Sequence, residues 1–132
     1  MENININKIG LICIRNKKLL VVHKRDIYQY ITVGGKTKPK ETDIACLNRE
    51  VKEEIGCKVK DLVYFTTFDM ILLNETKLHQ KCYFGKIYGK INPNNEIDDY
   101  LWISRNWKRY KIKLGPMLEH QIIPKLIQEE LL

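Results

Sequence analysis

One short segment between two strong helix boundary signals constrains this chain more than any other part of the sequence. Thr42 is a favourable N-cap, because its hydroxyl can accept a hydrogen bond from a backbone N–H of the first turn. Gly56 is a favourable C-cap, because glycine adopts the left-handed backbone conformation without steric strain. The apolar residues between them recur at intervals of three and four, namely Ile44, Leu47, Val51 and Ile55. This spacing predicts an amphipathic helix over about Thr42–Ile55.

Three glutamates share one side of this predicted helix. Glu50 lies three residues before Glu53 and four before Glu54, so the side chains are neighbours on the helix surface. Like charges at this spacing destabilise a helix by about 0.2–0.5 kcal/mol per pair, so the cluster does not serve helix stability. A bound divalent cation that neutralises the carboxylates explains it better. An oxygen-only site favours magnesium or manganese, and no zinc-type His or Cys pattern accompanies it. Arg49, four residues before Glu53, can pair with that carboxylate and orient it.

The residues around the glutamates resemble the signature of the Nudix hydrolase superfamily, whose MutT-like members are small enzymes. The family pattern is G-x5-E-x7-R-E-U-x-E-E-x-G-U, where U is a bulky apolar residue. The matching residues are Gly35, Glu41, Arg49, Glu50, Val51, Glu53, Glu54 and Gly56. The chain departs from the family at two places, because Cys57 takes the final apolar position and Val33 replaces the proline that usually precedes the glycine pair.

Strand-like segments surround the predicted helix, and this order predicts an α+β fold or an αβα sandwich. The segments are Ile9–Ile14, Leu19–His23, Tyr28–Val33, Val59–Asp69, Met70–Leu73, Lys77–Tyr88 and Ile97–Ile103. A second amphipathic helix is expected after Pro116, with Pro124 kinking or restarting it. The Nudix resemblance implies that a mixed central sheet lies between the helices. The length of the chain predicts a single domain over residues 1–132.

The resemblance also implies a reaction, the hydrolysis of a nucleoside diphosphate linked to another group. Mg²⁺ is the implied cofactor, and Mn²⁺ can substitute for it. Glu50 and Glu54 would be the main metal ligands, and the Gly34 carbonyl would be a further one. Glu53 would be either a third ligand or the catalytic base, and Glu41 would bind or order water outside the metal shell.

Residues outside the motif complete the expected site. A further carboxylate would come from the acidic segment before Trp102, and both Glu96 and Asp99 remain candidates for it. Candidate phosphate contacts are Lys24, Arg25 and Lys36, because their cationic side chains suit phosphate oxygens. The aromatic residues Tyr28, Tyr30, Phe68 and Tyr83 are either core residues or the walls of a pocket for a base.

The expected substrate is a small nucleotide, including a noncanonical or oxidised nucleoside triphosphate. One alternative is pyrophosphohydrolase activity at an RNA 5′ end. The net charge of +7, from 23 basic and 16 acidic residues, permits this, although the lysines form no concentrated stripe. Another alternative is a non-catalytic nucleotide-binding regulator, but the complete set of glutamates argues against it.

Hydropathy and cysteine spacing indicate a soluble cytoplasmic protein with no membrane partner. The first residues are too polar for a signal peptide, and no run of apolar residues is long enough to cross a bilayer. The four cysteines have neither metal-type nor redox-type spacing, so buried free thiols are expected. Either a monomer or a homodimer is compatible with the sequence.

Overall fold

The computed structural model describes residues 4–132, so Met1–Asn3 of the expected domain lie outside the described residues. The strands are β1 (Asn5–Ile12), β2 (Ile14–Arg15), β3 (Lys18–Lys24), β4 (Gln29–Ile31), β5 (Val33–Gly35), β6 (Lys58–Ile71), β7 (Lys77–Tyr88) and β8 (Ile97–Ile103). The helical segments are α1 (Asp43–Ile55), the 3-10 helix η1 (Trp107–Arg109), the π-helix η2 (Leu118–Ile122) and α2 (Ile123–Gln128).

The strands form two linked sheets. One has the order β5-β1-β7-β6 and is mixed, because β1 runs parallel to β7 while its other pairs are antiparallel. In the other sheet, β3 pairs antiparallel with β2, β4 and β8. Only Cys13 separates β1 from β2, so a nearly continuous stretch of chain passes from one sheet to the other.

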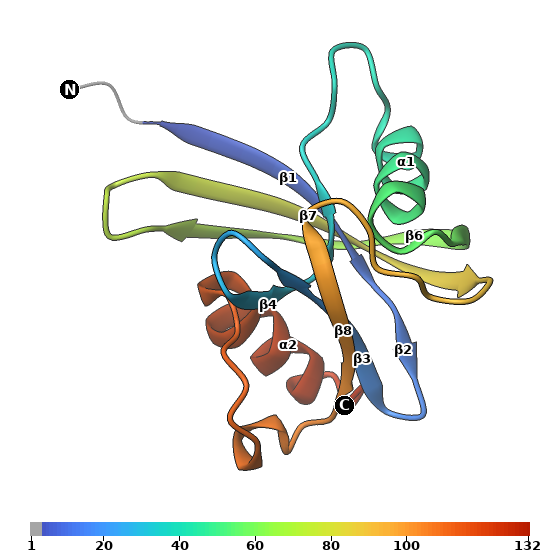
Figure 1. Ribbon diagram of the computed structural model, residues 1–132. Coiled ribbons are helices and arrows are strands. Elements are labelled where there is room, and N and C mark those ends of the chain that lie inside the picture. The colour runs from blue at the N-terminus through green and yellow to red at the C-terminus, as the bar shows by residue number, and fades with distance from the viewer. Residues whose placement is uncertain (1–3) are drawn as a thin grey trace.

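Helices α1 and α2 lie on opposite sides of the strands (Figure 1). Alternate residues of β3 explain how both faces are covered: Leu20 and Val22 pack in the core with α1, whereas Leu19 and Val21 pack in the core with the C-terminal helix. Adjacent strand residues point to opposite faces, so an uninterrupted apolar strand is buried on both. The expected αβα sandwich with a mixed sheet is therefore confirmed.

Two strand predictions need correction. The segment expected as one strand over Tyr28–Val33 is divided into β4 and β5, which belong to different sheets. The division delivers Gly34 from the second sheet to the edge of the first, where it pairs with Gly10. Met70 belongs to β6, which continues to Ile71 and absorbs two irregularities in its pairing with β7.

The C-terminal helix restarts near Pro124, as expected. The Ile123 N–H donates to the Leu118 carbonyl five residues back, which closes the π-helical turn, and α2 begins at Ile123. Because proline has no N–H to donate, it is tolerated in this first turn. Among residues 4–132, no helix combines the length and hydrophobicity that crossing a bilayer would require.

Helix α1 has both expected caps, and the N-cap makes a testable contribution. Thr42 Oγ1 accepts a hydrogen bond from the Ala45 N–H at 3.1 Å, and Gly56 is left-handed with a φ of 68°. Thr42→Ala leaves that N–H without its partner, so we expect the free energy of unfolding to fall by about 1 kcal/mol. Urea titration would measure the change, with Thr37→Ala in the preceding loop as a control. Equal midpoints for the two variants would contradict this prediction.

All four cysteines are free and buried. Burial raises the pKa of the Cys46 thiol to about 11 and that of Cys82 to about 12, and it also raises the pKa values of Cys13 and Cys57. Because the thiolate is the reactive form, we expect these cysteines to resist Ellman's reagent at pH 8 in the native protein. In denaturant all four should react. A thiol that reacts within minutes without denaturant would show that one of these positions is accessible.

Candidate active site

A cleft of about 660 Å³ runs from the glutamates of α1 to the C-terminal helix. Its charged lining consists of Lys8, Lys24, Lys36, Lys38, Arg49, Glu50, Glu54 and Glu96. Its other end is lined by apolar residues, including Leu72, Leu78, Met117 and Leu118. Both the volume and the division into a charged and an apolar end suit a small molecule with a polyanionic group and a ring system.

The glycine pair lets three elements meet at the charged end. Gly34 has a φ of 148°, and a Cβ there would lie 2.0 Å from the Ile9 carbonyl oxygen of β1. A Cβ on Gly35 would lie 2.7 Å from the Glu50 carboxyl group. Any larger residue would therefore separate β5 from β1 or from α1. Val33, in the position usually held by proline, is buried in the core and pairs with Leu11, so it leaves this approach intact.

Glu54 is the most deeply buried carboxylate of the site. It is 4% exposed, and its Oε1 accepts a hydrogen bond from the Gly34 N–H at 3.0 Å. Burial, together with the nearby charges of Glu50 and Glu96, raises its pKa to about 8, while the Gly34 N–H opposes the shift. Burial also raises the pKa of Glu50. Glu54 is therefore fully ionised at neutral pH only if a cation compensates its charge.

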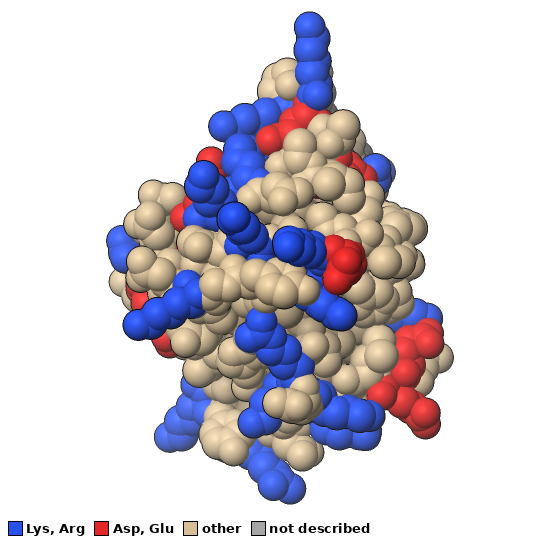
Figure 2. All heavy atoms as spheres, turned by 90° about the vertical axis from the view of Figure 1, so that its right-hand side faces the viewer, with Lys and Arg blue, Asp and Glu red and all other residues tan. Residues whose placement is uncertain are grey.

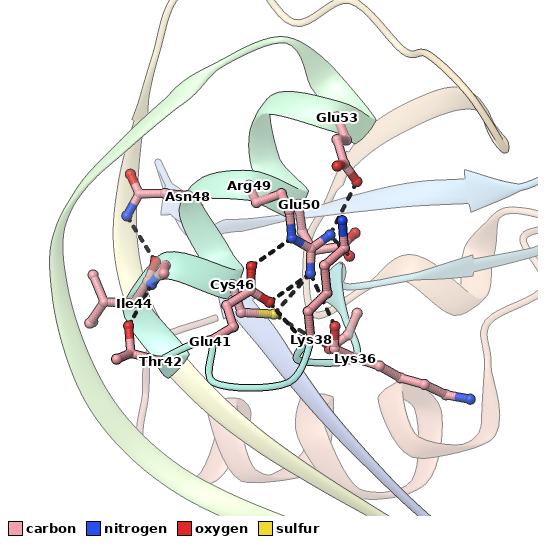
Figure 3. Close-up of polar contacts among 12 residues, drawn as sticks. Lys36, Lys38, Glu41, Thr42, Ile44, Cys46, Asn48, Arg49, Glu50 and Glu53 are labelled. Atoms are coloured by element: carbon pink, nitrogen blue, oxygen red, sulfur yellow. Dashed lines mark hydrogen bonds and ion pairs between the residues drawn. The ribbon is translucent and has the colours of Figure 1, made fainter.

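Arg49 is the hub of the polar contacts around α1 (Figure 3). Its Nε and Nη2 donate to both Glu41 oxygens at 2.7 and 2.8 Å, and its Nη1 donates to Glu50 at 2.7 Å and to Glu53 at 3.2 Å. Nη2 also donates to the Lys36 carbonyl at 3.1 Å. These hydrogen bonds hold the pKa of Glu41 at about 2. In this structure, Glu41 anchors Arg49.

The Arg49 contacts determine how the glutamates point. Among residues 4–132, no three His, Cys, Asp or Glu side chains are close enough together to enclose a metal ion. Glu50 and Glu53 are turned toward the guanidinium group, whereas Glu54 is turned toward Gly34. The donor set nevertheless fits a hard cation, because it offers carboxylate oxygens that burial and mutual repulsion disfavour as free anions.

Position separates the two candidates for the additional carboxylate. Glu96 lines the cleft and lies 3.7 Å from the Lys24 ammonium group. Asp99 is not part of the lining and accepts a hydrogen bond from the Tyr30 hydroxyl at 2.6 Å. The geometry therefore favours Glu96.

The cations at the cleft differ from the predicted set. Lys24 and Lys36 line it, but Arg25 does not and instead lies 3.7 Å from Asp98. The sequence interpretation missed Lys8 and Lys38, which also line the cleft. Lys8 belongs to no motif, and its location becomes evident only from the pairing of β1 with β7.

Of the two interpretations of the aromatic residues, the base pocket is not supported, since Tyr28, Tyr30, Phe68 and Tyr83 are all absent from the cleft lining. Phe68 packs in the core beneath the C-terminal helix. The Tyr83 hydroxyl donates to Asp43 at 2.6 Å on the α1 side of the sheet. The alternative interpretation, in which strand aromatics mainly serve packing and local hydrogen bonds, describes these two residues better.

The fold and the glutamate-bearing helix agree with a match to the NUDIX domain model over residues 6–121. The chain belongs to the Nudix family. It is accordingly a hydrolase of phosphoanhydride bonds, with activity of the nucleotide pyrophosphohydrolase type. Among curated proteins, no sequence matches this Nudix chain.

Solved structures share the fold at low sequence identity. The Escherichia coli ORF135 protein is 18% identical with a TM-score of 0.78, and the alignment covers 97% of this chain and 92% of that protein. A MutT protein from Methanosarcina mazei Go1 is 19% identical with a TM-score of 0.76 and 98% coverage of both chains. An ADP-ribose pyrophosphatase from Streptococcus suis is 16% identical with a TM-score of 0.70, covering 89% of this chain and 87% of that one. At these identities the likeness concerns the Nudix fold alone.

Proposed function

We propose that this Nudix protein is a Mg²⁺-dependent hydrolase of a nucleoside diphosphate linked to another group, with nucleoside triphosphates as its simplest substrates. The observation that carries the proposal is the joint lining of one cleft by glutamates, of which Glu54 is buried, and by lysines. Lysines suit the phosphate oxygens, and the glutamates suit the ions that accompany a polyphosphate. The apolar end of the same cleft is available to the nucleoside.

The metal ligands would be Glu50, Glu53, Glu54 and the Gly34 carbonyl. When bound, Mg²⁺ or Mn²⁺ would neutralise phosphate charge and lower the pKa of the attacking water. For Glu50 and Glu53 to act as ligands, their carboxylates would have to turn away from Arg49, to which both are hydrogen-bonded here.

The other residues would position the substrate and move the proton. Lys24 and Lys36 would hold phosphate oxygens at the mouth of the cleft, where both side chains contribute to the lining. Glu53, whose side chain is 45% exposed, would be the general base that accepts the proton of the attacking water if it is not a metal ligand. Glu96 is the second candidate for that role. Arg49, which Glu41 anchors, would hold the carboxylates of Glu50 and Glu53 in position during the reaction.

Release of phosphate or pyrophosphate from a nucleotide panel would test the proposal. The panel should contain nucleoside triphosphates, oxidised nucleotides, nucleotide sugars and dinucleoside polyphosphates, each with Mg²⁺, with Mn²⁺ and with EDTA. We expect turnover that depends on the metal. Absence of turnover for every compound, or turnover undiminished by EDTA, would overturn it.

The same assay separates the alternatives. Triphosphorylated RNA in the panel tests activity at an RNA 5′ end, and nucleotide binding without turnover would indicate a regulator. Figure 2 shows Lys and Arg side chains distributed over the face that it displays, without a single continuous stripe. On this face, no continuous cationic stripe supports an RNA strand as the substrate.

A further inference from the structure

One face of β1 runs along the floor of the cleft. Side chains two residues apart on a strand point to the same face and lie about 7 Å from one another, so Ile6, Lys8 and Gly10 form a row. Ile6 and Lys8 both line the cleft. A Cβ at Gly10 would lie 2.3 Å from Nε2 of Gln80, which also lines the cleft. All three positions of the row therefore face the same space.

The two ends of this row belong to the two ends of the cleft. Ile6 is the register partner of Leu78, which is part of the apolar lining. Gly10 is the register partner of Gly34, which is part of the charged end. Lys8 is the residue between them, so it stands where the charged end meets the apolar end. A molecule that occupies both ends must pass this side chain.

Lys8 is a half-buried cation without a partner in the described part of the chain, where its ammonium group forms neither a hydrogen bond nor an ion pair. By contrast, Lys24 lies 3.7 Å from Glu96. Burial, followed by the charges of Lys24 and Lys36, lowers the pKa of Lys8, while the charges of Glu54 and Glu96 oppose the shift. Because burial outweighs the carboxylates, a cation at this position weakens the fold unless an anion accompanies it.

The Lys8 ammonium group is available to a ligand. Every fully buried side-chain nitrogen or oxygen of residues 4–132 has a hydrogen-bond partner, so the unpartnered Lys8 Nζ is not fully buried. Lys24, and not Lys8, is the cation that most lowers the pKa of Glu54. An ammonium group offers three hydrogen-bond donors, and the oxygens of a phosphate accept such bonds, so a phosphate group suits this position.

We propose that Lys8 is a substrate-binding residue that contacts the phosphate joined to the nucleoside. With the polyphosphate at the charged end of the cleft and the nucleoside at the apolar end, this phosphate is the part of a nucleotide that lies beside Lys8. Lys24 and Lys36 then serve the phosphates farther along the chain. This inference rests on the proposed nucleotide hydrolysis and assigns a residue to one particular phosphate.

A comparison of matched substrates tests the contact. The probe is the panel compound that is hydrolysed fastest, paired with its analogue in which a methyl group replaces one nonbridging oxygen of the nucleoside-linked phosphate. We expect Lys8→Met to lower kcat/KM for the natural compound by about 10–100-fold, the range for a hydrogen bond to a charged group. With at least one diastereomer of the analogue the loss should shrink to about twofold or less, because the contact is already absent. An analogue that is not hydrolysed is compared by its inhibition constant.

Two variants and a second analogue serve as controls. Lys8→Arg keeps the positive charge and should retain more activity than Lys8→Met. Lys58→Met, at the exposed start of β6, makes the same exchange outside the cleft and should leave kcat/KM unchanged for both compounds. An analogue with its methyl group on a phosphate farther along the chain should still show the full loss in Lys8→Met.

Urea titration in EDTA supplies a measurement that does not depend on turnover. Lys8→Met replaces a half-buried cation with an apolar side chain, so its unfolding midpoint should equal or exceed that of the wild type. A midpoint below that of the wild type would mean that Lys8 serves as a counter-ion to the neighbouring glutamates, which would overturn the inference.

The outcomes separate this inference from the proposed function. Metal-dependent turnover that Lys8→Met leaves unchanged would overturn the inference while the proposed function stands. A loss of the same size with the natural compound and with both diastereomers would do the same. Absence of turnover for every compound in the panel would overturn both.

Discussion

Glu54→Gln should reduce kcat for nucleoside triphosphate hydrolysis by at least about 100-fold while preserving the fold. Loss of a group that merely supports a metal ligand costs about 10–100-fold, and Glu54 is proposed as a ligand itself. The glutamine carbonyl can still accept the hydrogen bond that Gly34 N–H donates to Glu54 at 3.0 Å. Activity with saturating Mg²⁺ and circular dichroism of the same preparation would measure the two parts of the prediction.

The same substitution should stabilise the metal-free protein. Folding raises the pKa of Glu54 from 4.5 to about 8, so the protonated form is favoured in the native state. Stability from this group is complete below pH 4.5 and is lost as the pH rises toward 8. Glutamine remains neutral and avoids that loss, which amounts to about 3 kcal/mol at pH 7. Urea titrations in EDTA should show a difference between variant and wild type that shrinks as the pH falls toward 4.5.

Glu53→Gln is the informative companion variant. The Glu53 side chain is 45% exposed, so we expect the loss of turnover without the gain in stability. Glu129→Gln, at the exposed end of α2, controls for the removal of one negative charge. Wild-type turnover in either Glu53→Gln or Glu54→Gln would contradict the proposed roles. A Glu54→Gln protein less stable than wild type in EDTA would contradict the account of its burial.

Local sequence signals predicted the elements that depend on nearest neighbours along the chain. The caps of α1 and the restart of the C-terminal helix near Pro124 follow from the conformations that threonine, glycine and proline allow. The motif spacing also located the glutamates, because positions three and four apart on a helix share one side.

Contacts between distant segments were the part that sequence patterns did not provide. Lys8 and Gln80 are 72 positions apart, and only the parallel pairing of β1 with β7 places them side by side. The division between β4 and β5 was missed for the same reason. An apolar run does not reveal that its two halves join different sheets. Arg25 and Asp99 have side chains that suit a phosphate contact and a metal ligand, respectively. In the structure, however, Arg25 lies beside Asp98, and Asp99 accepts a hydrogen bond from Tyr30.

Arg49→Met should lower kcat/KM by about 10–100-fold, because one guanidinium group organises three carboxylates. It donates to both oxygens of Glu41, and to Glu50 and Glu53. Arg49→Lys should restore little of the activity, since an ammonium group cannot reproduce the two-pronged contact with Glu41.

The pKa of Glu41 reports on the same contact independently of turnover. Hydrogen bonding to Arg49 holds it at about 2, so it should rise toward its ordinary value of 4.5 in Arg49→Met. Carbon-detected NMR titration would follow that carboxyl group, and Lys52→Met, which removes another cation from α1, should leave it unchanged. In Arg49→Met combined with Glu41→Gln, removal of the unpaired carboxylate should recover stability but not activity. Recovery of turnover in the double variant would mean that Arg49 only neutralises Glu41. Continued loss of turnover would mean that Arg49 contributes to catalysis by positioning Glu50 and Glu53.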